Sequence, residues 1–590
     1  MDTGLKVYRN PFSIKFGTQL DCKYGVLYPV FRKMMYPGDV FKVDADLLIR
    51  YQPMLAPPMN DCVATVRFAF APLRLLDSNT ELIVTGSNDG HLSEETLPVM
   101  DSVFKYLVTG TGKKVNEKHS ILDIMCQIPA INDDLTTGLQ AKLEASKGSP
   151  AAYFPKAYYR FWWDFYRDEN LYTAFTDFDS FWDSMKTKLN LADDSLMSVN
   201  LRKDRLTSAL PWQLKSVAAP RIPLNVTGQF SGGRATFGFS APIPDSNPGN
   251  EHYAAYNNLL YVGNFNPGVT KIGLGKINEG NELGTIPFVD FDRVEIDSTE
   301  KAADRVNGFS NNFASLLNTT NTLSGTMTNI DSIGIAGSQI RDVMAQTRIY
   351  ERLARCGSRY TEYLYANFGV APRDDTLQRA QYLGGFKTRI VTTEVVQTGG
   401  NSDDDPVGTL RGHGITHGTS TIKPFMAKEI GVMIGVLDIK PETIYGQGVD
   451  RELTARSRFD FFNPSFQHLS EQEVRKSEIF FGIDTDSDGN LKNDETWGFQ
   501  PYAQELRTGV KHVVGDMRDS LAYWNQALIF SSRPSLNDAF LKSTSHLSSY
   551  NRPFNFVDDS AYPMVVDFGG VIHAYRPLVK DGTPGLVDHN

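Results

Sequence analysis

The sequence predicts a mainly β protein that carries long loops and a helical insert. Short stretches alternate between apolar and polar residues, as in residues 40–44 and 64–70, which is the pattern of half-buried strands. The 48 glycines and 30 prolines are spread along the chain, as expected for many short strands joined by turns. A helical period is clear from residue 340 to 368.

The N-terminal block, residues 20–76, is expected to form strands. Residues 25–30 lead into Tyr36-Pro37-Gly38-Asp39, where Pro at the second and Gly at the third position predict a type II turn. The proline-containing stretch 53–58 cannot lie inside a strand ladder and is expected at an edge or in a loop.

The middle of the chain holds its densest group of aromatic residues, at 157–183. We expect a helix at about 132–143 before it. Interleaved Arg160 and Arg167 would allow the rings to stack on nucleic-acid bases. Our preferred interpretation is that the rings fill a core or a subunit interface, because aromatic residues dominate both.

Residues 225–335 differ in texture, being rich in Gly, Asn, Ser and Thr and poor in Lys and Arg. A stretch of this length is too long for a connecting loop and indicates an inserted subdomain or a functional segment. The corresponding domain prediction is 1–224, an inserted part at 225–335, and 336–590.

Helical and strand signals return after this insertion. We predict a helix at 340–355 that ends at Gly357, a second at 360–368 that ends at Gly369, and a turn at Gly384-Gly385. Strands follow at 388–396 and 430–439, the latter nearly all apolar and therefore buried. The last third, 478–577, is expected to alternate strand-like pieces with turns, with one helix at about 536–541.

The charge of the chain limits its partners. The net charge of -10 argues against a protein that coats nucleic acid over its whole surface. Residues 339–391 are locally positive, with nine Lys or Arg against five Asp or Glu. Two interpretations stay open: an ordinary helix face with paired charges, which we prefer, or a surface that meets phosphate or a neighbouring subunit.

Cysteine usage and hydropathy point to a reducing compartment and no membrane insertion. Cys22, Cys62, Cys126 and Cys356 are far apart, have no metal-like spacing and are expected to be buried free thiols. The first residues lack the apolar region of a secretion signal, and no run of about 18 apolar residues occurs.

One segment fits a calcium-loop signature in full, D-x-D-x-D-G-x5-E. Alternate positions would point carboxylates inward, glycine would permit the sharp turn, and the final glutamate would bind with both oxygens. The predicted ligands are Asp484, Asp486, Asp488, Asn490 and Glu495. The flanks, 479–481 and 497–499, resemble strands and not the helices of an EF-hand, so an ordinary hairpin loop is the alternative.

No catalytic residue can be named. His413 and His417 are four residues apart, but the interleaved glycines predict a loop and not a helical metal site. The sequence contains no nucleophile elbow, phosphate-binding loop or zinc-protease motif. We therefore predict no enzyme and no cofactor other than the possible calcium ion.

Several ordered motifs resemble the major capsid protein of the microviruses, and especially of the gokushoviruses. The motifs are Arg359-Tyr360-x-Glu362, Asn367-Phe368-Gly369-Val370, Leu377-Gln378-Arg379, Tyr382-Leu383-Gly384-Gly385, Gln397-Thr398, Phe165-Tyr166-Arg167-Asp168-x-Asn170-Leu171, Gly498-Phe499-Gln500-Pro501-Tyr502 and Arg533-Pro534-x-Leu536-Asn537. The resemblance implies a single jelly-roll β-sandwich with long loop and helical insertions. It also implies that residues 225–335 form a surface protrusion that meets the host.

The function implied by the resemblance is structural. Copies of the chain would assemble in the bacterial cytoplasm into a T=1 icosahedral shell of a virion around circular single-stranded DNA. The implied partners are an internal scaffolding protein, a small basic DNA-binding protein, a pilot protein, the DNA on the inner face and a host cell-surface receptor. The alternatives are a calcium-stabilised β-rich enzyme such as a glycoside hydrolase, or a host-binding spike protein.

Overall fold

The computed structural model describes most of the chain in two compact units. The described residues are 9–85, 99–215, 225–227, 260–262, 272–274, 332–334, 337–355, 359–396, 398, 408–466, 471–554 and 561–580. One unit comprises Met1–Ala218 with Arg348–Asn590, and the other comprises Ala219–Thr347. Each is described by itself.

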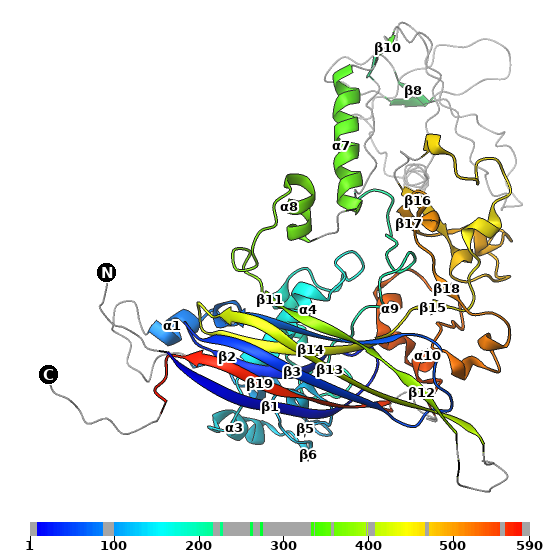
Figure 1. Ribbon diagram of the computed structural model, residues 1–590. Coiled ribbons are helices and arrows are strands. Elements are labelled where there is room, and N and C mark those ends of the chain that lie inside the picture. Colours follow the sequence, from blue (N-terminus) through cyan, green and yellow to red (C-terminus); the bar gives the residue numbers. More distant parts are fainter. Residues whose placement is uncertain are drawn as a thin grey trace, which may run out of the picture. The chain divides into compact units, whose positions relative to one another are not determined.

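The first unit is built on two antiparallel sheets (Figure 1). The order of the first sheet is β1 (Asn10–Cys22), β19 (Met564–Arg576), β3 (Val40–Tyr51), β13 (Leu410–Met426) and β12 (Thr392–Val396). The order of the second is β11 (Gln381–Ile390), β4 (Cys62–Pro72), β14 (Gly431–Pro441) and β2 (Tyr28–Met35). This mainly β, two-sheet arrangement confirms the predicted fold class.

The core lies between the two sheets and follows from the alternation along their strands. Phe41, Val43 and Leu47 of β3 are fully buried, as are Val66 and Phe68 of β4. Each such side chain contributes roughly 1.5–3 kcal/mol when it leaves water. Strand β1 pairs with β19 from Asn10↔Arg576 to Cys22↔Met564, so strands from the two ends of the chain lie side by side in the first sheet.

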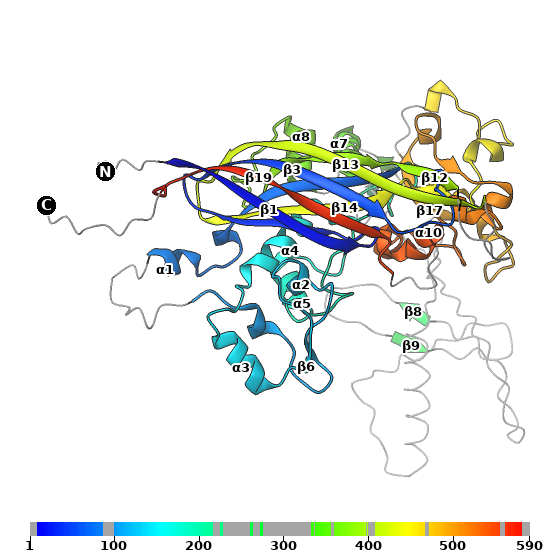
Figure 2. The same ribbon diagram turned by 60° about the horizontal axis from the view of Figure 1, so that its bottom comes forward.

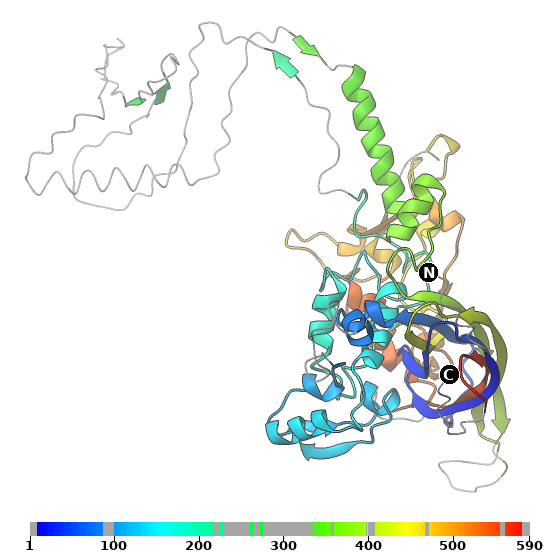
Figure 3. The ribbon, with the colours of Figure 1, turned by 90° about the vertical axis from the view of Figure 1, so that its left-hand side faces the viewer.

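A helical layer covers the outer face of the second sheet. It contains α4 (Tyr153–Phe165), α5 (Phe178–Met185) and α2 (Ile121–Ile124), which lie together on one side of the strands (Figures 2 and 3). Ile434 and Val436 of β14 pack against this layer, whereas Met433 and Leu437 face the sandwich core. Strand β14 is therefore buried on both faces, which confirms the prediction for residues 430–439 and explains its apolar run.

Small elements complete the N-terminal half of this unit. They are η1 (Leu73–Leu75), α1 (Thr80–Thr85), η2 (Val103–Tyr106), β5 (Lys114–Asn116), β6 (Ile131–Asp134) and α3 (Thr137–Ala145). The predicted helix at 132–143 is wrong at its start, because β6 occupies its first residues, and right from Thr137 onward. The predicted type II turn is confirmed: Gly38 has φ +84° and Asp39 N donates to Tyr36 O at 2.9 Å.

The predicted helix pair is confirmed by α7 (Gly337–Arg355) and α8 (Tyr360–Phe368), whose C-terminal Gly369 has φ +69°. Gly357 lies outside the described residues. The predicted turn at Gly384-Gly385 is wrong. These glycines form an irregularity inside β11, where a Cβ on Gly385 would lie 2.1 Å from the carbonyl oxygen of Val66.

The last third of the chain is mostly short turns and bridges. Its elements are β15 (Ile444–Tyr445), η3 (Arg451–Thr454), η4 (Pro464–Phe466), β16 (Glu471–Arg475), η5 (Lys476–Glu478), η6 (Lys492–Asp494), β17 (Thr496–Pro501), η7 (Gln504–Leu506), β18 (Lys511–His512), η8 (Gly515–Arg518), η9 (Ala522–Trp524), α9 (Asp538–Leu541), η10 (Ser543–His546) and α10 (Leu547–Asn551). The predicted strand at 479–481 is absent there, whereas the one at 497–499 lies in β17.

In the second unit, β7 (Asn225–Thr227) pairs with β10 (Ser332–Gly334), and β8 (Leu260–Val262) pairs with β9 (Ile272–Leu274). Most of the predicted insertion 225–335 lies outside the described residues, so its boundaries stay a prediction. Among the helices that the structure describes, none has the length and apolar character needed to cross a bilayer.

Candidate functional site

The predicted calcium loop forms a tight turn around Asp486. Its carboxylate accepts backbone N–H bonds from Asp488 and Asn490, each at 2.9 Å, and Gly489 supplies a positive φ of +83°. The hydrogen bond from the backbone amide of Asn490 is the main cause of the lowered pKa of Asp486. The side chains of Asp488 and Asn490 are exposed. Asp486 therefore holds the loop by hydrogen bonds to its own backbone.

The two ends of this loop are engaged by cations of the same chain. Arg533 donates to Asp484 through Nη2 at 2.5 Å and Nε at 3.2 Å, and this lowers the pKa of Asp484. Glu495 pairs with Lys476. Within the described ranges, no three His, Cys, Asp or Glu side chains gather as a metal site. As placed, the loop does not fit calcium, and calcium binding stays a prediction.

The histidine pair lies on a strand, so the predicted loop around it is wrong. His413 and His417 are both exposed on β13. The glycines that follow each histidine serve close packing: a Cβ on Gly414 would lie 2.3 Å from the Tyr51 ring, and one on Gly418 would lie 2.2 Å from Thr388. At about 3.3 Å per residue, two strand residues four apart stand about 13 Å from each other.

The arginines of residues 341–398 are largely committed to partners in the same chain. Arg355 Nε lies 3.1 Å from Glu471, Arg359 Nε 3.3 Å from Glu169, and Arg379 Nε 3.2 Å from Asp374. Arg389 pairs with Asp61. This pairing favours the interpretation of an ordinary charged surface over that of a continuous phosphate-binding one.

The aromatic cluster at 157–183 is core, as preferred from the sequence. Tyr158, Tyr159 and Phe161 are fully buried, and Trp162 stacks on Phe181 with ring centroids 5.3 Å apart. The tyrosine hydroxyls donate to Leu27 O and Ser195 O, each at 2.7 Å. Rings enclosed in this way cannot stack on bases.

Of the cysteines, Cys22 and Cys62 are free and buried, Cys126 is free and partly buried, and Cys356 lies outside the described residues.

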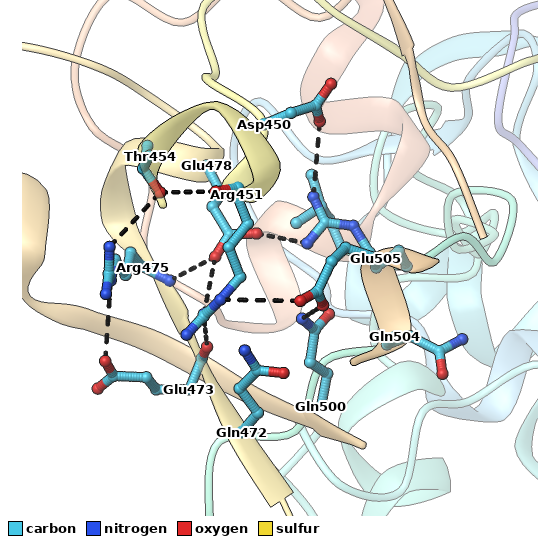
Figure 4. Close-up of polar contacts among 12 residues, drawn as sticks. Asp450, Arg451, Thr454, Gln472, Glu473, Arg475, Glu478, Gln500, Gln504 and Glu505 are labelled. Carbon is cyan, nitrogen blue, oxygen red and sulfur yellow. Dashed lines mark hydrogen bonds and ion pairs between the residues drawn. The ribbon is translucent and has the colours of Figure 1, made fainter. Parts of the chain in front are cut away.

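A buried polar network that the sequence did not reveal surrounds Glu478 (Figure 4). The side chain of Glu478 is 1% exposed and pairs with Arg205, which is 2% exposed. Glu478 Oε1 also accepts from the backbone amide of Arg475 at 3.0 Å and from Arg451 Nη1 at 3.4 Å. Burying a carboxylate is unfavourable unless cations and donors surround it, and here three groups do.

The polar network extends outward from Glu478 to the segment that follows η3. Arg451 Nη1 donates to Glu473 O at 2.6 Å, and Arg451 Nε lies 3.9 Å from Glu505. Arg475 Nη2 lies 4.0 Å from Asp460. Two arginines therefore join the buried carboxylate to β16, to η7 and to the segment that follows η3.

We call that segment, residues 456–466, the aromatic loop. Asp460 closes its first turn by accepting backbone N–H bonds from Ser457 at 2.7 Å and Arg456 at 3.0 Å, which lower the pKa of Asp460 to about 2. Phe462 and Phe466 pack near Tyr502, with ring centroids 6.2 and 6.5 Å from it. The loop thus has a defined conformation.

The aromatic loop nevertheless leaves large rings in solvent. Phe459, Phe461 and Phe462 are 66%, 59% and 49% exposed. The signal in the sequence was Phe459-Asp460-Phe461-Phe462, which neither alternates like a strand nor repeats like an amphipathic helix.

Comparisons with known proteins all match capsid proteins, and each match covers nearly the whole chain. A family model described as "Capsid protein (F protein)" matches residues 3–586. The chain is similar to "Capsid protein VP1" of Chlamydia phage 1, with 26% identity over 98% of this chain and 96% of that protein. It is similar to the proteins of the same name from Bdellovibrio phage phiMH2K, 27% identical over 98% and 95%, and Spiroplasma virus 4, 26% identical over 99% and 97%.

Proposed function

The chain belongs to the F-protein family of phage capsid proteins, and from this premise we propose that it builds a T=1 icosahedral shell around circular single-stranded DNA. The resemblance to microvirus capsid proteins is confirmed. The protein is a structural, non-enzymatic component of the virion, and copies of it assemble into the shell.

One observation carries this function: the family match covers residues 3–586, so both sheets and the segments between them belong to the matched region. The two-sheet sandwich is a common building block of viral shells, because its rigid core leaves the loops free to contact neighbours. The enzyme and spike alternatives account for neither the family nor the full-length match. The shell size and the type of genome are supported by the microvirus resemblance.

We propose that charge neutralisation of the genome falls mainly to another protein. The chain has a net charge of -10 and pairs Arg355, Arg359, Arg379 and Arg389 with its own carboxylates. A shell of this composition attracts DNA weakly, since binding to DNA strengthens with the number of Lys and Arg side chains that are available to its phosphates. A small basic DNA-binding protein, together with the scaffolding and pilot proteins implied by the resemblance, is the proposed set of partners.

We propose that residues 225–335 form a surface protrusion that attaches to a host receptor. The support is their composition, rich in Gly, Asn, Ser and Thr and poor in Lys and Arg, which differs from that of the rest of the chain. A long polar insertion of this kind is uncommon in a compact domain unless it has a function of its own.

Electron microscopy of particles made from the full-length chain, produced together with the other genes of its phage, tests the shell. We expect closed shells of one size, and DNA from them that single-strand-specific nuclease digests and exonuclease does not. Unassembled subunits or shells of mixed sizes would overturn the T=1 proposal. Double-stranded or linear DNA in uniform shells would overturn the proposal for the genome alone.

A further inference from the structure

The exposed rings of the aromatic loop present as much apolar surface as the largest apolar patch of a typical soluble monomer. A phenylalanine contributes about 200 Å² of surface, so the exposed fractions of Phe459, Phe461 and Phe462 correspond to roughly 350 Å². The largest apolar patch on a soluble monomer is about 300–600 Å² and is commonly functional. Three rings within four positions of one loop already reach that range.

The loop is held in shape before any partner arrives. Asp460 fixes the turn at Arg456 and Ser457, and Tyr502 supports the rings of Phe462 and Phe466. Arg475, which also contacts the Glu478 network through its backbone, lies beside Asp460. A preorganised surface loses little conformational entropy on binding, and this raises affinity without further contacts.

The loop also has the composition of an interface centre and a charge opposite to that of the chain. Arg456 and Arg458 are exposed, and the Arg458 guanidinium lies 4.9 Å from the centre of the Phe459 ring. Aromatic residues and arginine are enriched at the residues that dominate binding energy. The loop has two arginines and one aspartate, whereas the whole chain has a net charge of -10. The loop's charge is therefore opposite in sign to the net charge of a second copy of this chain, which favours their approach.

We propose that the aromatic loop, residues 456–466, is a contact through which neighbouring copies of this chain bind each other in the shell. The inference rests on shell assembly as described above. Within a shell, each copy buries apolar surface against its neighbours, and this loop presents such surface in a fixed conformation.

Cysteine labelling of Phe461→Cys in the full-length chain tests burial directly. The probe is a bulky water-soluble maleimide, applied to unassembled subunits and to DNA-free shells, with the wild type correcting for the native cysteines. We expect labelling to fall at least tenfold on assembly. Equal labelling in subunits and DNA-free shells overturns the inference, as does protection that appears only in DNA-filled particles, which identifies DNA as the occupant.

A triple variant, Phe459→Ala with Phe461→Ala and Phe462→Ala, tests the contribution to assembly. Because about half or more of each ring is exposed, far-UV circular dichroism should not change and melting of the subunit should fall only slightly, while the yield of shells falls at least tenfold. Phe368→Ala is a matched control, since Phe368 is 67% exposed on α8 and lies outside the loop. Normal shells from the triple variant overturn the inference alone, whereas a wild type that never forms shells overturns the assembly function itself.

Discussion

Arg205 and Glu478 form an ion pair that is almost sealed from water, although 273 positions separate them in the chain. Their side chains are 2% and 1% exposed. Arg205 belongs to the segment that follows the aromatic helices, and Glu478 ends η5, a few residues before the predicted calcium loop. The pair therefore ties the last third of the chain to the segment after the aromatic helices, at a point where neither has long secondary structure.

Replacing Arg205 by methionine should be strongly destabilising. The change leaves the Glu478 carboxylate buried with only Arg451 and one backbone amide, and breaking a buried pair in this way typically costs about 3–5 kcal/mol. Because those two partners remain, we expect a loss of about 3 kcal/mol in the free energy of unfolding, measured in urea on unassembled subunits.

Two further variants separate this effect from a general loss of charge. Arg389→Met removes an exposed partner of Asp61 and should change stability by less than about 1 kcal/mol. Adding Glu478→Leu to Arg205→Met should recover part of the loss, because the uncompensated charge disappears. Similar losses from Arg205→Met and Arg389→Met would contradict the role of the buried pair.

Calcium would have to displace Arg533 from Asp484 in order to bind the predicted loop. Replacing Arg533 by glutamine frees both carboxylate oxygens of Asp484, which calcium would need. If the loop binds calcium, millimolar calcium should therefore raise the melting temperature of Arg533→Gln more than that of the wild type. Adding Asp486→Ala and Glu495→Gln should abolish the difference. Absence of any calcium response in Arg533→Gln would remove the calcium prediction.

Elements that depend on local signals were predictable from the sequence. The apolar run of β14 indicated burial on both faces, and Gly369 marked the end of α8 because that position has a positive φ. Local patterns failed where a distant residue decides the conformation. The glycines of β13 looked like loop residues, but Gly414 is there because the Tyr51 ring occupies the space of its side chain.

The candidate site was less predictable than the fold, for a physical reason. The calcium signature describes spacing along the chain, whereas the partner of Asp484 is Arg533, which lies 49 positions away. Glu478 belongs to no motif, and its importance comes from burial and from Arg205. The aromatic loop has an unusual composition but neither the strand nor the helix periodicity. The sequence therefore did not reveal that the loop is ordered by Asp460 and Tyr502.

Gly414→Ala should destabilise the sandwich by about 1–3 kcal/mol, the range for overpacking a tight site. Tyr51 cannot move aside easily, because its ring is 5% exposed and packs against Phe554 at 5.6 Å. Gly17→Ala is the matched control, since its new Cβ would meet only the Phe568 carbonyl oxygen at 3.9 Å. Urea unfolding of both variants checks the prediction, and equal stabilities would contradict it.

Asp460 should make the order of the aromatic loop depend on pH only under strongly acidic conditions. Its pKa in the folded chain is about 2, below the usual 3.8, because two backbone amides donate to the charged form. Its stabilising contribution is therefore fully present above about pH 4 and is lost as the pH falls through 2. Asp460→Asn lacks the charge at every pH, so pepsin should cleave this variant faster than the wild type in the loop at pH 4. The two cleavage rates, mapped by mass spectrometry, should converge as the pH falls below 2, where the wild-type carboxylate becomes protonated as well. Convergence already at pH 3.8 would show an ordinary carboxylate that does not hold the turn.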